Sequence, residues 1–119
     1  MNKLTTAQPI PKIWINSKPE ALKELLFKHG QAILEMNTIE NDYTRSCRIG
    51  ERLIVEPGSP KINERNRYVV GIGDKLLLCR VLQEKQHKEK LNLLGYGEVD
   101  INEVVIWCQV KKRASIRSK

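Results

Sequence analysis

The chain has 119 residues, of which 40% are hydrophobic and 29% charged, a composition typical of one domain with its own core. It has no apolar run long enough to cross a membrane, and the N-terminus has no apolar segment followed by a cleavage site. We therefore expect neither a membrane span nor a secretion signal, and we expect a cytoplasmic location.

The net charge of +7 is concentrated near the C-terminus. Residues 109–119 carry five Lys or Arg and no Asp or Glu, whereas the two charge types nearly balance over the rest of the chain. A solvated basic tail over residues 111–119 explains this pattern, and so does a segment that contacts nucleic acid or an acidic partner. The candidate contact residues are Lys111, Lys112, Arg113, Arg117 and Lys119.

The three cysteines, Cys47, Cys79 and Cys108, are odd in number and too widely spaced for a C-x-x-C metal motif. The two histidines, His29 and His87, lie more than four residues from any cysteine and from each other. We therefore predict no metal site and no cofactor, and we interpret the cysteines as isolated core thiols.

The first predicted element is a helix that follows an N-terminal arm of residues 1–16. Residues 17–20 match a capping box, in which the Ser17 hydroxyl and the Glu20 side chain each accept a hydrogen bond from the other residue's backbone amide. Apolar residues then recur at helical spacing, and Gly30 supplies a left-handed stop. The helix is predicted over residues 18–29.

After Gly30 the sequence changes to short apolar runs separated by turn residues, a pattern typical of β-strands. Turn signals lie at residues 57–60 and 73–74, and a charged loop spans residues 84–90. The predicted strands are residues 32–36, 53–55, 68–70, 75–83, 91–94 and 104–110. The sequence therefore predicts a mostly β domain over residues 17–110, of α+β type with one N-terminal helix and about six to seven short strands.

The order of these segments resembles the C-terminal, peptidase-like domain of the LexA, UmuD and lambda-type phage repressor family. The matching segments are residues 50–57, 67–70, the 73–74 hairpin that leads into 78–81, then 91–94 and 104–110. The resemblance covers roughly residues 31–113. It implies a twisted β domain of the LexA and signal-peptidase type.

In that family a serine attacks a peptide bond with a strand lysine as its base. The family's spacing places the serine near Asp42 and the lysine at Cys79, so the resemblance implies that both members of the Ser-Lys dyad are absent. Thr44 and Ser46 lie near the first position but out of register. An aspartate beside a thiol would raise the pKa of the thiol and would not activate it. We therefore predict a catalytically inactive domain and not an enzyme.

Such a domain is expected to mediate self-association, as a homodimer or higher oligomer, or contact with another regulatory protein. Its setting would be the transcriptional control of a mobile element or of a stress response. Residues 104–110 are predicted to form an exposed sheet edge that pairs with a second copy. The expected interface residues are Val104, Ile106, Trp107 and Val110, with Trp107 either in the core or across the dimer.

Two alternative functions stay open from the sequence. One is a nucleic-acid-binding protein, with DNA as a partner, that uses the basic tail together with Arg65, Arg67 and Arg80. The other is a divergent self-cleaving peptidase that acts at alkaline pH. A helix-turn-helix over residues 20–45 and a phosphate-binding glycine loop at residues 71–73 fit the sequence less well.

Overall fold

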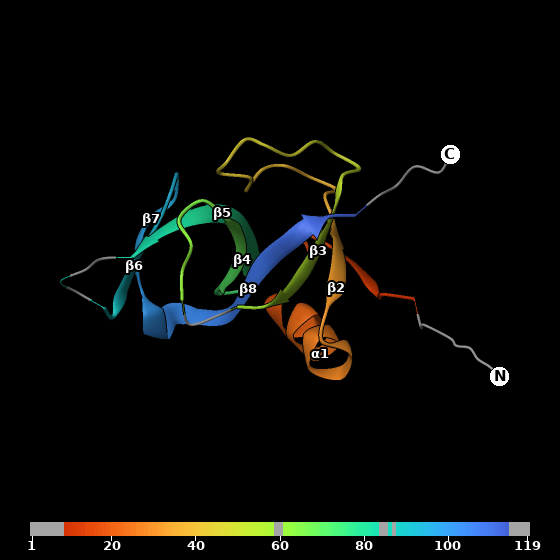
Figure 1. The fold of residues 1–119 in the computed structure, drawn as a ribbon, viewed down its shortest axis with the longest axis horizontal. Helices are drawn as coiled ribbons and strands as arrows, with labels where there is room; N and C mark the ends of the chain where they lie inside the picture. The colour runs from red at the N-terminus through yellow and green to blue at the C-terminus, as the bar shows by residue number, and fades with distance from the viewer. Residues whose placement is uncertain (1–8, 59–60, 84–85, 87, 115–119) are drawn as a thin grey trace.

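The computed structural model describes residues 9–58, 61–83, 86 and 88–114. Within these residues one α-helix accompanies eight strands, which form a single sheet in the order β1-β2-β3-β8-β4-β5-β6-β7 (Figure 1). The prediction of a mostly β domain with one N-terminal helix is therefore confirmed.

The elements follow one another along the chain with short connections, apart from the long loop between β2 and β3. They are β1 (Lys12–Trp14), α1 (Pro19–His29), β2 (Ala32–Glu35), β3 (Arg52–Pro57), β4 (Arg67–Ile72), β5 (Lys75–Gln83), β6 (Lys90–Leu93), β7 (Gly97–Asp100), the 3₁₀ turn η1 (Ile101–Glu103) and β8 (Val104–Arg113). The six predicted strands correspond to β2, β3, β4, β5, β6 and β8. Residues 59–60 of the predicted turn and 84, 85 and 87 of the predicted charged loop lie outside the described residues.

The helix α1 ends as predicted but begins differently. The N–H of Gly30, which has a φ of 78°, donates to the Leu26 carbonyl at 2.8 Å, as expected for a left-handed stop. At the other end the N-cap is Lys18, and no side chain caps the helix, so the predicted capping box at residues 17–20 is wrong. Ser17 precedes the N-cap residue by one position, so it does not reach the amides of the first helical turn. It belongs to the preceding turn, in which its N–H donates to the Trp14 carbonyl at 3.0 Å.

Two strands were not predicted, because each is only three or four residues long and lacks a clear alternation of apolar side chains. One of them, β1, comes from the segment expected to be an arm. It pairs in parallel with β2, with Lys12 opposite Ile33, and the following residue Ile15 is fully buried. Residues 9–16 therefore belong to the folded domain, whereas residues 1–8 of the predicted arm lie outside the described residues.

The sheet separates two hydrophobic clusters. Neighbouring residues of β5 alternate between them, with Leu76 and Leu78 in the first and Leu77 and Cys79 in the second, as expected for side chains on opposite faces of a strand. The buried leucines of α1 belong to the first cluster, so the helix covers that face. In the second cluster, Tyr68 and Trp107 are stacked with their ring centroids 4.8 Å apart. Trp107 therefore packs within the domain.

The strand β8 lies in the middle of the sheet, between β3 and β4. The prediction that residues 104–110 form an exposed edge is therefore wrong. The physical reason is that β8 has apolar side chains directed to both faces, as strands buried on both sides do. Ile106 and Val110 pack against the first cluster, whereas Val104 and Trp107 pack against the second.

The strand β8 also extends three residues beyond its predicted end. Lys112 lies opposite Ile54 of β3, and Arg113 lies opposite Leu53. The boundary between the domain and the basic tail therefore falls after Arg113 and not after residue 110. Arg117 and Lys119 lie outside the described residues.

Candidate functional site

The structure places the two positions expected to carry the dyad next to each other in the backbone. Asp42, in the β2–β3 loop, forms a parallel bridge with Leu78 of β5. The Leu78 N–H donates to the Asn41 carbonyl at 3.1 Å, and the Leu78 carbonyl accepts from the Tyr43 N–H at 3.0 Å. The loop thus lies against the residue that precedes Cys79 in β5.

The side chains of Asp42 and Cys79 are nevertheless directed to opposite sides of the sheet. The Asp42 carboxylate binds the backbone of Cys47, whose side chain belongs to the first cluster, whereas Cys79 belongs to the second. Burial raises the pKa of the Cys79 thiol to about 12. Because the thiolate is the nucleophilic form, Cys79 is not reactive at neutral pH. Asp42 and Cys79 therefore do not form a catalytic pair.

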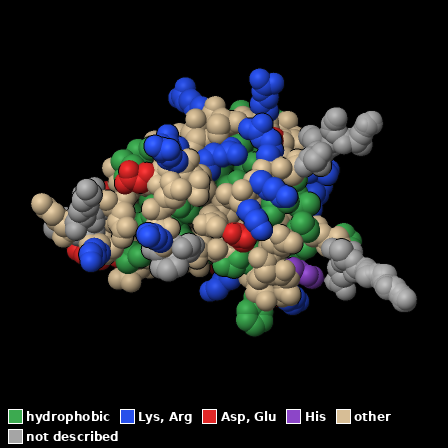
Figure 2. All heavy atoms as spheres, viewed as in Figure 1, with side chains coloured by type: hydrophobic (Ala, Val, Ile, Leu, Met, Phe, Trp, Pro, Cys, Tyr) green, Lys and Arg blue, Asp and Glu red, His purple; other side chains and the backbone are tan. Residues whose placement is uncertain are grey.

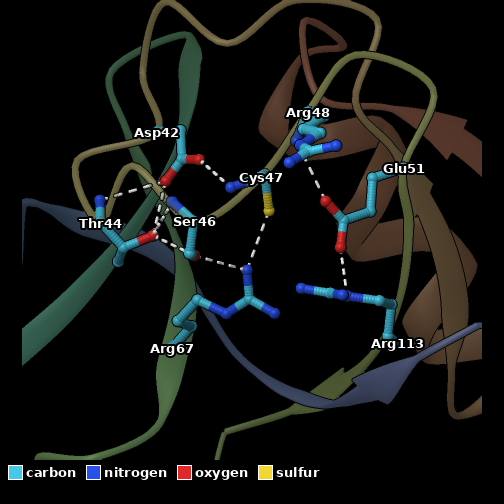
Figure 3. A network of polar contacts seen from close by, with 8 residues as sticks. All are labelled: Asp42, Thr44, Ser46, Cys47, Arg48, Glu51, Arg67 and Arg113. Carbon is cyan, nitrogen blue, oxygen red and sulfur yellow. Dashed lines mark hydrogen bonds and ion pairs between the residues drawn. The ribbon is translucent and has the colours of Figure 1, made fainter.

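The Asp42 carboxylate closes the loop on itself (Figure 3). Its Oδ1 accepts from the Thr44 N–H at 3.1 Å, the Thr44 hydroxyl at 2.6 Å and the Arg45 N–H at 3.0 Å, and its Oδ2 accepts from the Cys47 N–H at 2.7 Å. Arg45 has a φ of 57°, which few residues other than glycine adopt. The loop has no strand partner for these amides, so the carboxylate supplies the acceptors that they need.

The thiol beside Asp42 is that of Cys47, a residue for which the sequence suggested no role beyond the core. Nη1 of Arg67 in β4 donates to the Cys47 Sγ at 2.8 Å and to the Ser46 Oγ at 2.9 Å (Figure 3). Burial raises the pKa of Cys47 and outweighs the lowering effect of Arg67. Cys47 is therefore a neutral thiol near neutral pH. The sequence signal for this site is the spacing of Asp42 and Thr44, which is typical of a turn closed by an aspartate side chain.

A second carboxylate connects the end of this loop to β8. Glu51 accepts from the Arg48 N–H at 3.0 Å and forms an ion pair with Arg113 (Figure 3). The surface hollow beside these contacts has a volume of about 670 Å³ and is lined by Ser46, Arg48, Ile49, Gly50, Glu51, Arg52, Arg113 and Ala114. The loop and the end of β8 therefore form one surface, on which three of the lining side chains are arginines.

Two of the three arginines predicted as nucleic-acid contacts lie on neighbouring strands, and the third, Arg65, lies in the turn before β4. Arg67 of β4 and Arg80 of β5 are direct cross-strand partners. Arg80 donates through Nε and Nη2 to the backbone carbonyl of Glu64, at 3.1 and 3.0 Å, and this places Arg65 near it in the chain. Lys111 lies 3.9 Å from Glu56. The structure thus brings Arg67 to the β2–β3 loop, while Arg113 is paired with Glu51.

The glycines of residues 71–73 form part of a strand and a hairpin turn. Gly71 is buried in β4, where an added Cβ would lie 2.5 Å from the Ile106 side chain. Gly73 has a φ of 62° and turns the chain into β5. Packing and turn geometry therefore account for these glycines, in place of phosphate binding.

Across the described ranges, no group of three or more His, Cys, Asp or Glu side chains is placed to hold a metal ion. The described part of the chain also has no helix that is both long and apolar enough to span a membrane. Comparison with known proteins gives no match to a family model, to a curated protein or to a solved structure.

Proposed function

We propose that the chain is a catalytically inactive regulatory domain of the LexA and phage-repressor C-terminal type, which works in the cytoplasm by self-association in transcriptional control. One observation carries this proposal. The loop and the strand that hold the dyad in that family lie side by side here, joined by the bridge between Asp42 and Leu78, and the positions that correspond to the serine and the lysine are Asp42 and Cys79.

The hydroxyl groups near Asp42 also lack a suitable base. The Ser46 Oγ lies 2.6 Å from the Thr44 Oγ1 and accepts a hydrogen bond from Arg67. An arginine stays protonated in proteins and cannot take a proton from a hydroxyl. The Thr44 hydroxyl donates to a carboxylate that already holds three backbone amides. These contacts support a structural role for the loop and not peptide cleavage.

Intact-mass spectrometry after long incubation at alkaline pH tests the loss of peptidase activity. We expect the mass of the purified protein to stay unchanged. A pair of fragments that appears in the wild-type protein, and is absent in the matched variant Ser46→Ala, would show that the loop cleaves the chain and would overturn this part of the proposal.

The free edge of β1 is the proposed surface for self-association. The Ile33 N–H donates to the Pro11 carbonyl at 2.7 Å, and the Ile15 N–H donates to the Glu35 carbonyl at 2.9 Å. Because backbone groups alternate in direction along a strand, those of Lys12 and Trp14 point away from β2. Trp14 is 50% exposed beside these groups. Among the described residues this edge has no strand partner, and such an edge with an exposed indole suits a second copy that adds its own strand.

Sedimentation velocity over a range of concentrations tests this surface. We expect the wild-type protein to associate at high micromolar concentration, and Trp14→Ala to remain monomeric there. The matched control is Phe27→Ala, because Phe27 is 90% exposed but lies on α1, away from the edge of β1. A monomeric wild-type protein, or equal association of both variants, would contradict the proposal.

A further inference from the structure

Five exposed or partly exposed arginines from three separate segments are related by hydrogen bonds and strand pairing, and they are here called the basic face: Arg45, Arg48, Arg65, Arg67 and Arg80. Hydrogen bonds and strand pairing link them in order. Arg45 and Arg48 flank the Ser46 and Cys47 side chains that Arg67 contacts, Arg67 is opposite Arg80, and Arg80 binds the carbonyl beside Arg65. Figure 2 shows Lys and Arg side chains gathered over the upper half of the molecule, where Figure 1 places the β2–β3 loop and the end of β8.

Among the described residues, none of these five arginines forms a side-chain ion pair. The acceptors that hold its arginines are neutral groups, namely the Ser46 hydroxyl and Cys47 thiol for Arg67 and the Glu64 carbonyl for Arg80. In contrast, Arg52 and Arg113 nearby are paired with Glu35 and Glu51. The contacts therefore orient Arg67 and Arg80 without cancelling their charge, so less side-chain freedom is lost when an anion binds.

The shape of the basic face fits a linear polyanion. It extends from Arg80 on β5 and Arg67 on β4 to Arg45 and Arg48 in the loop that leads into β3. The three strand spacings between β5 and β3 add up to about 14 Å. This length equals about four nucleotides of one strand in a duplex. Tyr43 lines a surface hollow together with Arg45 and Cys47 and packs edge-on against Tyr96, so an aromatic pair lies beside the loop end of the basic face.

We infer that the basic face binds the phosphate backbone of nucleic acid without regard to sequence. This inference goes beyond self-association and does not depend on it, because the edge of β1 contributes no residue to the basic face. The guanidinium groups of Arg45, Arg48, Arg67 and Arg80 each contact one phosphate, and the paired Glu51 limits the affinity on the side of Arg113.

Fluorescence anisotropy with a short labelled DNA duplex of mixed sequence tests the inference. Four phosphate contacts give a slope of about −3.6 for the logarithm of affinity against the logarithm of salt concentration, or about 150-fold weaker binding at 200 mM than at 50 mM salt. An absence of binding at low salt, or a complete loss of binding when residues 115–119 are deleted, would overturn the inference.

A matched pair of double variants locates the surface. Arg48→Gln with Arg80→Gln removes two contacts, so the affinity at 0.1 M salt should fall about 60-fold and the slope should fall to about −1.8. Lys23→Gln with Lys28→Gln removes the same charge from α1 and should leave the affinity within about twofold. An equal loss in both pairs would contradict a localised site.

Two further measurements separate this inference from its alternatives. Polyglutamate, which is acidic but carries no phosphate, should bind far more weakly than the duplex, and equal binding would identify an acidic protein as the partner instead. Sedimentation velocity of the Arg48→Gln and Arg80→Gln double variant should show the same self-association as the wild-type protein. A circular dichroism melt of each variant checks that it is folded.

Discussion

Replacement of Asp42 tests whether the β2–β3 loop is held by one carboxylate. Asp42→Ala removes the acceptor of four hydrogen bonds, of which the one from the Cys47 N–H lies at a buried position. A buried donor without a partner costs about 1–3 kcal/mol, and the partly buried donors of Thr44 and Arg45 add about 0.5–1 kcal/mol each. We therefore expect the free energy of unfolding to fall by about 3 kcal/mol.

Urea denaturation followed by circular dichroism measures this loss. With an m-value of about 2 kcal/mol/M, the midpoint should shift downward by about 1.5 M. Asp42→Asn keeps one acceptor oxygen and should show roughly half of the effect. The control is Glu40→Ala, an exposed residue of the same loop, which should change stability by less than about 0.5 kcal/mol.

A loss for Asp42→Ala no larger than that of Glu40→Ala would refute this reasoning. It would mean that the loop amides find other acceptors, and that the carboxylate is available for a role other than closing the loop. The structural role assigned to Asp42 would then fail together with the stability prediction.

Two further predictions concern a buried thiol and the start of the helix. The pKa of Cys79 rises on folding from 9.0 to about 12, so its contribution to stability is full below pH 9 and is lost as the pH rises from there towards 12. Wild-type stability in urea should therefore fall by about 1.4 kcal/mol per pH unit more than that of Cys79→Ala in this range, and parallel pH profiles would contradict the burial argument. Ser17→Ala should lower the free energy of unfolding in urea by less than about 0.5 kcal/mol, because no side chain caps α1. If Ser17 did cap the helix, its removal would lower the free energy of unfolding by about 1 kcal/mol, and that result would contradict the structure.

The elements that could be predicted from the sequence are those specified by neighbouring residues. The stop at Gly30 depends on a local left-handed conformation, and the apolar runs of β5 and β8 predict strands wherever they lie in the sheet. The loop position of Asp42 also followed from local polarity. The short strand β7 escaped prediction because a single buried apolar residue, Val99, gives no periodic pattern.

The sequence by itself determined a single helix and six of the strands, because each depends on residue type and local spacing. Only the tertiary structure decided that β8 lies between β3 and β4, that Asp42 binds Cys47 and not Cys79, and that Arg67 contacts the β2–β3 loop. These arrangements depend on the pairing of segments far apart in the chain. Local periodicity does not specify such pairing. The residues of a strand show that it is buried on both faces, but they do not show which other strands lie beside it.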